Sequence, residues 1–540
     1  MTRSLGSTVA SYAARCRTSA LIGALLLASV MSLRPLSAQQ ADTARERSPY
    51  EQLQLFSSVL NHIRVNYMDS VTYRELVRAA IEGMLHALDP HSSFLSRRDW
   101  ERRSALERGD LPGVGVAVEQ EDSVITVLDV VPGSPAAKAG IQPGDRVAAI
   151  DDTVVAQLKI ADVALRLAGS EGSTVRVRLE RGMRLEPETL SVVLTRRALK
   201  LPIVWVSLLP DHVTGYARLA WFGPKAGDEL QDAIRGLRER GAQQLMLDLR
   251  DNPGGLMDAA VDIASGFFPK GTVIFRTKGR KADTTKDFVT ERNGAFSRLP
   301  LIVLLNERSA SAAEALAGSL QDHDRALIVG RRSFGKALVQ GPFLLQPAGD
   351  VVMLTIARVV TPSGRVIQRR YRSLGYEQYE SFAGKSGAAE DTVQVFKTDH
   401  GREVRGGGGI APDVSLPPPR DLPVWWSVAA ASGFDFAVAD SVAATLPATP
   451  AARDQWLSEP ARWSGLLEAF LRRVRTRLDV SAQTDSALSA RISLALASRV
   501  VAVRWPSNGV NELWIRNDPD IRAALPYFGR LPTLLSAPQH

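Results

Sequence analysis

The chain of 540 residues has one cysteine, Cys16, and seven scattered histidines. A single cysteine forms no disulfide within the chain, and Cys16 lies before the apolar stretch that a lipid-attachment cysteine would follow. Neither an HExxH motif nor a P-loop pattern occurs. These absences exclude a disulfide scaffold and argue against a metalloprotease and an ATP-driven enzyme. We therefore expect no metal site and no cofactor.

Long basic blocks are also absent. The chain has 66 Lys and Arg against 58 Asp and Glu, a net charge of +8, and the basic residues are interleaved with acidic ones. Four of the arginines lie in the first 38 residues; without them the balance is 62 against 58, or +4. Such a balance gives no reason to expect nucleic-acid binding.

The first 38 residues are typical of a secretory signal peptide. They contain no acidic residue and four arginines, three of them before an apolar stretch at 18–33. They end in Leu36-Ser37-Ala38. We expect cleavage after Ala38, a linker at 39–49, and export to the periplasm or the medium. The apolar run is short for a membrane span, which needs about 20 residues, and an uncleaved membrane anchor stays open as the alternative.

Residues 306–314 combine a serine with a strand–turn–helix pattern. They follow an apolar run, 299–305, that predicts a buried strand, and they lead into 312–320, which is rich in good helix formers. Ser311 then lies near a helix N-terminus, where free N–H groups and the helix dipole can stabilise an oxyanion. Taken alone, the pattern is more typical of a plain helix cap.

A second stretch, 332–341, places Lys336 between glycine and apolar residues, just after a predicted buried strand at 326–330. Partial burial would disfavour the charged amine, and a neutral lysine can take the proton of a serine hydroxyl. Gln340, four residues on, is placed to orient that amine. Taken alone, this stretch would be interpreted as a surface lysine in a loop.

Together the two stretches resemble the carboxy-terminal processing (tail-specific) proteases, a family of Ser/Lys peptidases. Ser311 and Lys336 are 25 positions apart, Glu314 follows the serine by three and Gln340 follows the lysine by four, as in that family. The resemblance covers residues 50 to 415, with Ala313 standing where many members have a serine. Further matching segments are Leu88-Asp89-Pro90-His91-Ser92-Ser93-Phe94, Asp248-Leu249-Arg250-Asp251-Asn252-Pro253-Gly254-Gly255, Thr361-Pro362-Ser363-Gly364-Arg365 and Gly408-Gly409-Ile410-Ala411-Pro412-Asp413.

The resemblance implies catalytic roles for four residues. Ser311 would be the nucleophile and Lys336 the general base, while Gln340 would position the lysine and Glu314 would support the local network.

An oxyanion site is implied by the same resemblance. It would consist of the Ala312 N–H and the N–H of Gly254 or Gly255, and the choice between the glycines stays open. Glycine amides at a strand end can approach a reacting carbonyl closely. A plain turn is the alternative for this glycine pair.

Valines at 114, 116 and 118 and apolar residues at 124–127 predict strands. The run from Ser134 to Val147, a helix at 160–167 and strands at 175–179 and 190–194 follow. With these segments, residues 112–197 resemble a PDZ domain of the bacterial protease type. Glycines let consecutive N–H groups converge on a terminal carboxylate, and the adjacent strand edge can pair with an extended peptide. We expect an apolar final residue of the substrate to bind near Val163 and Leu167. The alternative is a domain that only regulates access to the active site. The candidate peptide-binding residues are Gly113, Val114, Gly115 and Val116.

The rest of the chain completes the predicted architecture. Apolar residues at helical spacing predict two helices within 50–90, in an N-terminal helical segment at 50–111, and we interpret their stripes as core. So short a helix pair must pack on the protease body or mediate oligomer contacts. Strands alternating with helices at 198–415 predict an α/β protease body with a central β-sheet, with a flexible insertion at 371–409. The inserted PDZ domain is β-rich, and residues 416–540 form a mainly helical C-terminal extension.

The predicted function is that of an exported serine endopeptidase. It would recognise the free C-termini of protein or peptide substrates through its PDZ domain and cleave through a Ser–Lys acyl-enzyme. Nucleic acid and metal are not expected as partners, whereas a homo-oligomer or an adaptor stays open. The alternative is a catalytically silent, PDZ-bearing scaffold of the same fold, which would have no need of Ser311, Lys336 and Gln340.

Overall fold

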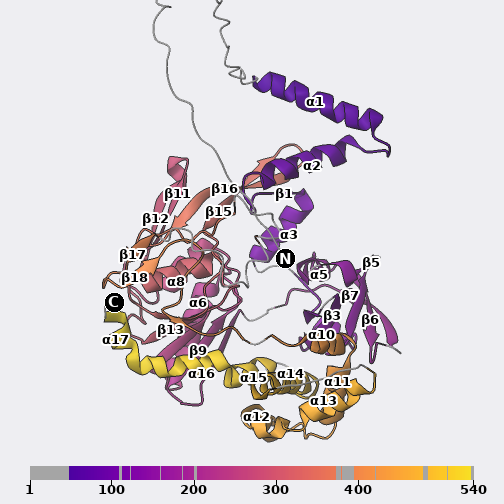
Figure 1. Ribbon diagram of the computed structural model, residues 1–540, viewed down its shortest axis with the longest axis vertical. Helices are drawn as coiled ribbons and strands as arrows, with labels where there is room; N and C mark the ends of the chain where they lie inside the picture. Colours follow the sequence, from indigo (N-terminus) through magenta and orange to yellow (C-terminus); the bar gives the residue numbers. More distant parts are fainter. Residues whose placement is uncertain are drawn as a thin grey trace, which may run out of the picture. The chain divides into compact units, whose positions relative to one another are not determined.

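The computed structural model describes residues 48–108, 112–121, 123–158, 160–184, 187–199, 203–371, 379, 394–419, 421–477, 485–506 and 509–536 (Figure 1). The predicted signal peptide at 1–38 and most of the linker at 39–49 lie outside these residues, as does much of the predicted insertion. The chain divides into two units, Met1–Ala79 and Ala80–His540.

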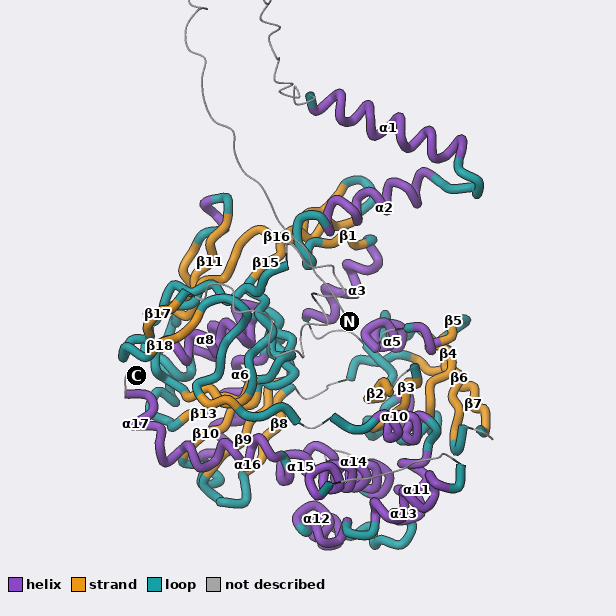
Figure 2. The backbone as a smooth tube through the Cα atoms, viewed as in Figure 1, coloured by secondary structure: helices purple, strands orange, loops and turns teal. Residues whose placement is uncertain are grey.

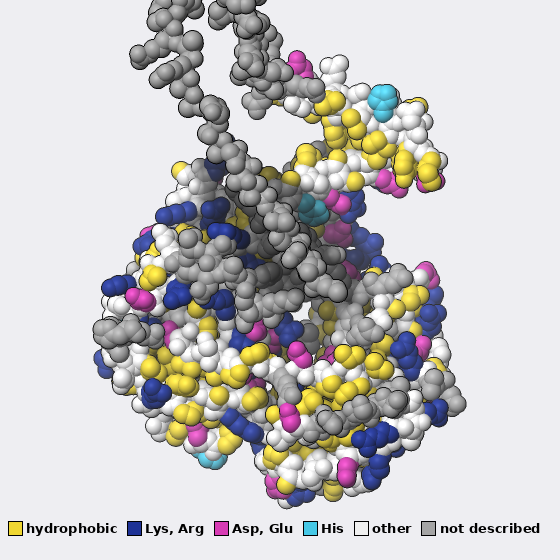
Figure 3. Space-filling view, viewed as in Figure 1, with side chains coloured by type: hydrophobic (Ala, Val, Ile, Leu, Met, Phe, Trp, Pro, Cys, Tyr) yellow, Lys and Arg dark blue, Asp and Glu magenta, His cyan; other side chains and the backbone are white. Residues whose placement is uncertain are grey.

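The helices predicted near the N-terminus are α1 (Pro49–Asn66) and α2 (Tyr73–His86). A capping box precedes α2, because the N–H of Thr72 donates to Glu75 at 2.8 Å and the N–H of Glu75 donates to Thr72 Oγ1 at 3.2 Å. In this chain α1 buries no residue and α2 buries only Leu85, so the prediction that a partner surface covers the apolar stripes stays a prediction. Hydrophobic side chains are exposed along these helices (Figure 3). An amphipathic pattern shows that a face is apolar, not that a partner covers it.

A six-stranded sheet forms the centre of the protease body, in the order β19-β14-β13-β10-β9-β8. Its strands pair in parallel except for β8 with β9. All the neighbouring parallel strands therefore end at one edge of the sheet. The strands are β8 (Val204–Leu208), β9 (Thr214–Leu219), β10 (Gln244–Asp248), β13 (Leu301–Leu305), β14 (Leu327–Gly330) and β19 (Val414–Ser415).

Helices cover both faces of this sheet (Figure 2). Alternate strand residues enter opposite cores, since Leu301, Val303 and Leu305 share one cluster and Ile302 and Leu304 share another. The first face carries α6 (Ala226–Glu239), α7 (Met257–Ala264) and α8 (Ala312–Asp322). The second face carries α15 (Gly509–Asn517), α16 (Pro519–Ala524), the 3₁₀ helix η5 (Leu525–Arg530) and α17 (Leu531–Ser536).

A second sheet has five antiparallel strands. Four of them follow the order β1-β16-β11-β12, and β15 also pairs with β16. Its β15 strand directly follows Lys336 and Ala337 and contains Gln340. The elements are β1 (Ser93–Leu95), α3 (Arg97–Glu107), β11 (Val273–Gly279), η2 (Ala282–Thr284), β12 (Lys286–Val289), β15 (Leu338–Leu345), β16 (Asp350–Val360), and the hairpin β17 (Val395–Lys397) and β18 (Glu403–Arg405).

The predicted β-rich domain is a separate sheet, β2-β3-β4-β6-β7, with β5 paired to β4. Strand β2 lies at its edge, and α5 packs on a core of its own. The elements are β2 (Val116–Glu121), β3 (Val124–Val130), α4 (Pro135–Lys138), β4 (Arg146–Ile150), β5 (Thr153–Val154), η1 (Val155–Gln157), α5 (Ile160–Leu167), β6 (Thr174–Arg181) and β7 (Glu188–Thr195).

The predicted C-terminal extension begins with a helical core of its own. Within the described residues α14 is the one helix long and apolar enough to cross a membrane, and 56% of its apolar window is buried in the protein. The central sheet, the separate β-rich domain and the helices at both ends of the chain together confirm the predicted fold class, an α/β protease body with an inserted PDZ domain. The helices are α10 (Val424–Ala431), α11 (Phe434–Ala443), α12 (Pro450–Ser458), η4 (Pro460–Trp463), α13 (Leu466–Arg475) and α14 (Ser486–Arg504).

Candidate active site

Three loops meet where the parallel strands β10, β13 and β14 end: 249–256, 306–311 and 331–337. Hydrogen bonds join each loop to the next. Ser309 Oγ donates to the carbonyl of Leu249 at 2.8 Å, and the N–H of Phe334 donates to the carbonyl of Ser309 at 2.9 Å. The candidate residues of the first, second and third loops are thereby brought to one place.

Ser311 is the N-cap of α8 and has a positive φ of 57° with ψ of −116°. A non-glycine residue rarely adopts this conformation, which costs energy and persists only where its surroundings hold it. The hold comes in part from Glu314, whose carboxylate accepts the Ser311 N–H at 2.8 Å. The half-buried Ser311 thus lies on a sharp strand-to-helix turn, as the sequence predicted.

The Glu314 carboxylate connects the nucleophile segment to the lysine segment. Its Oε2 accepts the N–H of Ser311 and the N–H of Lys336, each at 2.8 Å. Its Oε1 accepts Ser333 Oγ–H at 2.5 Å and the Gly335 N–H at 2.6 Å. One fully buried side chain therefore fixes the backbone on both sides of the predicted dyad.

Burial raises the pKa of Glu314 from its ordinary value of 4.5 to about 7, although hydrogen bonds from Ser333 and from the backbone N–H groups lower it. A carboxylate out of water is penalised for its charge, and the four donors only partly offset that penalty. The protonation state of this connecting group therefore changes near neutral pH.

The half-buried Lys336 lies among residues for which the sequence suggested no role. Burial, and then the charge of Lys336, lower the pKa of His91 to about 4, so this histidine is neutral at pH 7. The His91 Nε2 lies 3.0 Å from the hydroxyl of Tyr379. Gln368 Oε1 accepts the N–H of Ala337, the next residue after the lysine, at 2.7 Å. His91 belongs to a segment that matched the family, but nothing local indicated that its pKa responds to the charge of the lysine.

Gln340 is engaged on the sheet in this structure. Its side-chain amide donates to the carbonyl of Leu338 at 3.2 Å and to Thr355 Oγ1 at 3.3 Å. Its role in orienting Lys336 stays a prediction.

Gly254 approaches the nucleophile closely. A Cβ built on it would lie 2.8 Å from the Cβ of Ser311 and 2.9 Å from the nitrogen of Ala312, and its φ is +96°. Its own N–H donates to Asn252 Oδ1 at 2.8 Å. Within the described part of the chain, the N–H groups of Gly255 and Ala312 have no hydrogen-bond acceptor. The site thus contains the predicted amides, with that of Gly254 engaged and those of Gly255 and Ala312 unengaged.

The predicted carboxylate loop leads into edge strand β2. Gly113 pairs with Arg197, Val114 is buried, and the carbonyl of Gly115 accepts the N–H of Val131 at 2.9 Å. Gly115 has φ +85°, and a Cβ there would lie 2.3 Å from the Cβ of Ser134. Val116, Val163 and Leu167 share one hydrophobic cluster with Val114.

Residues 213–377 match the sequence profile of Peptidase family S41, and residues 112–193 match that of the PDZ domain. The carboxy-terminal-processing protease of Bartonella bacilliformis is 34% identical over 352 residues, which cover 64% of this chain and 78% of that protein. The chain belongs to peptidase family S41. This S41 peptidase is also 35% identical to the carboxyl-terminal-processing protease of Synechocystis sp., over 55% of this chain and 69% of that protein.

Among solved structures, the photosystem II D1 C-terminal processing protease is similar to this S41 chain. It is 29% identical with a TM-score of 0.39, covering 70% of this chain and 89% of that chain. The predicted family and enzyme class are confirmed by the sequence comparisons: the protein is a serine-type peptidase with a PDZ domain. The roles of the individual site residues stay predictions. Within the described residues, no group of three or more His, Cys, Asp and Glu is placed to hold a metal ion.

Proposed function

We propose that this S41 peptidase cleaves exported proteins that it recognises by their free C-termini, using Ser311 and Lys336. The observation that carries the proposal is the Glu314 carboxylate, which binds the backbone N–H of both residues and so fixes the two segments together. A scaffold without catalysis would not need a buried acid at this junction, because burying it carries an energetic cost.

The proposed reaction is acyl transfer. Neutral Lys336 takes the proton of the Ser311 hydroxyl as its oxygen attacks the scissile carbonyl. The N–H of Ala312 holds the oxyanion of the tetrahedral intermediate together with a glycine N–H, and Gly255 is the better candidate because the Gly254 N–H donates to Asn252. Lys336 then gives the proton to the leaving amine, and the acyl-enzyme remains. Lys336 next takes a proton from water, which attacks the ester, and the same proton returns to Ser311 as the acid product leaves.

Substrate selection is proposed to take place on the PDZ domain. The Gly113 N–H donates to the carbonyl of Arg197 at 2.9 Å, so the N–H groups of the next residues of the predicted loop, Val114 to Val116, would bind the terminal carboxylate. Edge strand β2 would pair with the preceding residues of the substrate. The relatives' names, carboxy-terminal-processing protease, support this choice of substrate.

Peptide cleavage by the purified chain tests the chemistry. We expect wild-type protein to cut a peptide with a free C-terminus, and Ser311→Ala and Lys336→Ala each to lose about 10³-fold or more in kcat/KM, because the pair acts as a unit. Lys336→Arg should fail too, since a guanidinium stays charged. The matched control is Lys225→Ala, a change at the N-cap of α6. Near-normal turnover by Lys336→Ala would contradict the Ser–Lys mechanism.

Export is proposed from the first 38 residues. The full chain, expressed in a bacterial host, should yield a mature protein that begins at Gln39 in the periplasm or the medium. Intact-mass measurement of the recovered protein checks this. A membrane-bound product that retains Met1 would favour the uncleaved anchor.

A further inference from the structure

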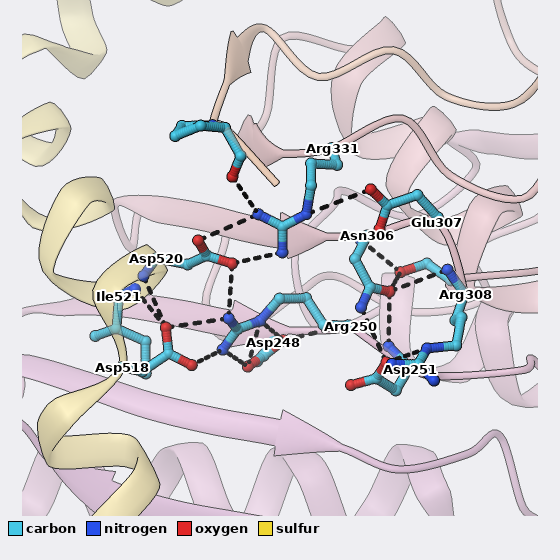
Figure 4. A network of polar contacts seen from close by, with 12 residues as sticks. Asp248, Arg250, Asp251, Asn306, Glu307, Arg308, Arg331, Asp518, Asp520 and Ile521 are labelled. Atoms are coloured by element: carbon cyan, nitrogen blue, oxygen red, sulfur yellow. Dashed lines mark hydrogen bonds and ion pairs between the residues drawn. The ribbon is translucent and has the colours of Figure 1, made fainter. Parts of the chain in front are cut away.

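Two carboxylates of the C-terminal extension contact the arginines of two catalytic loops (Figure 4). Asp518 and Asp520 lie at the start of α16. Arg250 Nη1 donates to Asp518 Oδ1 at 3.1 Å and to Asp520 Oδ2 at 3.0 Å. Arg331 donates to both oxygens of Asp520, at 3.2 Å and 2.7 Å. A single carboxylate, that of Asp520, therefore joins loops that are 81 residues apart in sequence.

Both arginines stand close to catalytic groups along the chain. Arg250 precedes Gly254 by four residues, and Arg331 precedes Lys336 by five. Arg250 Nη2 also lies 2.6 Å from Oδ2 of the fully buried Asp248, at the end of β10. Arg250 is therefore held by ion pairs to the sheet as well as to the extension. A shift of either arginine would be passed to the oxyanion loop or to the lysine loop through a few peptide bonds.

The loop that carries Ser311 belongs to the same network. The N–H of Asp251 donates to Asn306 Oδ1 at 2.9 Å, and the Asn306 side chain donates back to Asp251 at 2.9 Å. Glu307 lies 3.6 Å from Arg331. All three catalytic loops are thus connected to one another and, through Asp520, to the extension.

The extension can hold this position because it is itself anchored. Ile521 and Ala524 of α16 are buried against the sheet in the cluster that contains Ile302 and Leu304. The side chain of Asp520 is 13% exposed and that of Arg331 is 10% exposed. Forked arginine–carboxylate pairs with little water access fix both distance and orientation.

We propose that Asp518 and Asp520 are positioning residues for catalysis. Through them the C-terminal extension fixes the oxyanion loop (249–256) and the lysine loop (331–337) in place relative to Ser311. This inference rests on the proposed Ser–Lys mechanism. The extension is accordingly part of the peptidase site, although none of its residues touches the substrate in this proposal.

The test compares Asp520→Asn, Asp518→Asn and Asp520→Glu with wild type in the full chain, by kcat and KM on a free-acid peptide. We expect kcat to fall about 10- to 100-fold for Asp520→Asn, because small misplacements of catalytic groups have effects of that size. KM should stay within about two-fold, since neither aspartate contacts the peptide-binding loop. Asp518→Asn should lose less, and Asp520→Glu should recover part of the rate. Labelling of Ser311 by a fluorophosphonate should slow in parallel.

The matched control is Glu512→Gln. Glu512 pairs with Arg453 and Arg516 inside the extension and with no catalytic loop, so kcat should be unchanged. If Asp520→Asn does not fold, as judged by circular dichroism, Arg331→Lys replaces it, because lysine keeps the charge but loses the fork.

The inference is overturned if the folded variant keeps wild-type kcat and labelling rate, or if Glu512→Gln loses as much. Failure of the proposed function looks different: wild type itself would not cleave, or Ser311→Ala would cleave as well as wild type.

Discussion

Replacing Glu314 by glutamine is the sharpest probe of the site, because it changes one atom of the group that connects Ser311 to Lys336. The carboxylate accepts four hydrogen bonds, two on each oxygen. Glutamine has one acceptor oxygen and one NH₂ group. Its favoured orientation keeps the oxygen on the N–H groups of Ser311 and Lys336 and turns the NH₂ towards Ser333, whose hydroxyl can accept. The Gly335 N–H then faces a donor.

The expected change in stability is small. One buried, unsatisfied donor costs about 1–3 kcal/mol. Against this, a rise in the pKa of Glu314 from 4.5 to about 7 corresponds to a penalty of about 3 kcal/mol for its charge above pH 7, which glutamine does not carry. The two effects nearly cancel at pH 8. Glu314→Ala instead leaves four donors without an acceptor and should cost several kcal/mol, enough to threaten folding.

The sign of the pH dependence follows from the raised pKa. The neutral acid is favoured in the folded state, so the contribution of Glu314 to stability is fully present below pH 4.5 and is lost as pH rises through about 7. Wild type should therefore lose stability relative to Glu314→Gln over that interval. Protonated Glu314 resembles glutamine, so the activities of the two proteins should converge as the pH falls below about 7.

Activity and stability should separate in the assay. We expect kcat/KM of Glu314→Gln to fall about 10- to 100-fold at pH 8, because Gly335 is displaced directly before Lys336. The melting temperature should stay within a few degrees of wild type. The measurements are peptide cleavage between pH 5.5 and 9.5 and thermal unfolding in the same buffers. Full activity of Glu314→Gln at pH 8 would refute the reasoning. A change in activity near pH 7 that persists in the pH profile of this variant would refute it too.

Two further predictions concern glycines and tails. Gly254→Ala should reduce kcat/KM at least 100-fold and destabilise the protein by about 1–3 kcal/mol, because the φ of Gly254 is +96° and a Cβ would lie 2.7 Å from the carbonyl oxygen of Ala310. The control is Gly271→Ala, with φ +86° and open space around it, which should lose stability but no activity. Equal activity losses in the two variants would contradict the close approach of Gly254 to the nucleophile. Amidating the substrate's C-terminus should weaken its cleavage about ten-fold or more, because charge-assisted contacts contribute about 1.5–3 kcal/mol. Gly115→Ala, whose Cβ would lie 2.3 Å from that of Ser134, should remove this preference, and equal cleavage of both peptides by wild type would end the case for tail recognition.

Much of the architecture follows from local sequence patterns. The apolar runs that become β10, β13 and β14, and the helix formers of α8, place Ser311 on a strand-to-helix turn without reference to the rest of the chain. The same spacing reasoning located Lys336 after a buried strand. It also predicted α1, whose apolar stripe is exposed in this chain.

Other features depend on contacts that no local pattern encodes. The sequence placed Glu314 three residues after Ser311, but only the fold brings the N–H of Lys336 to its carboxylate. The charge of Lys336 helps to lower the pKa of His91 although 245 positions separate the two residues.

The sequence by itself determined the order of most strands and helices, because periodicity reports which groups are near along the chain. Its motifs showed the resemblance to the family, and the catalytic roles of Ser311 and Lys336 stay predictions. Only the tertiary structure decided that α15 to α17 cover the second face of the central sheet, and that Asp520 accepts hydrogen bonds from Arg250 and Arg331. Parallel strands bring their carboxyl ends to one edge whatever their separation in sequence. Which distant side chain meets them there depends on how the buried faces pack.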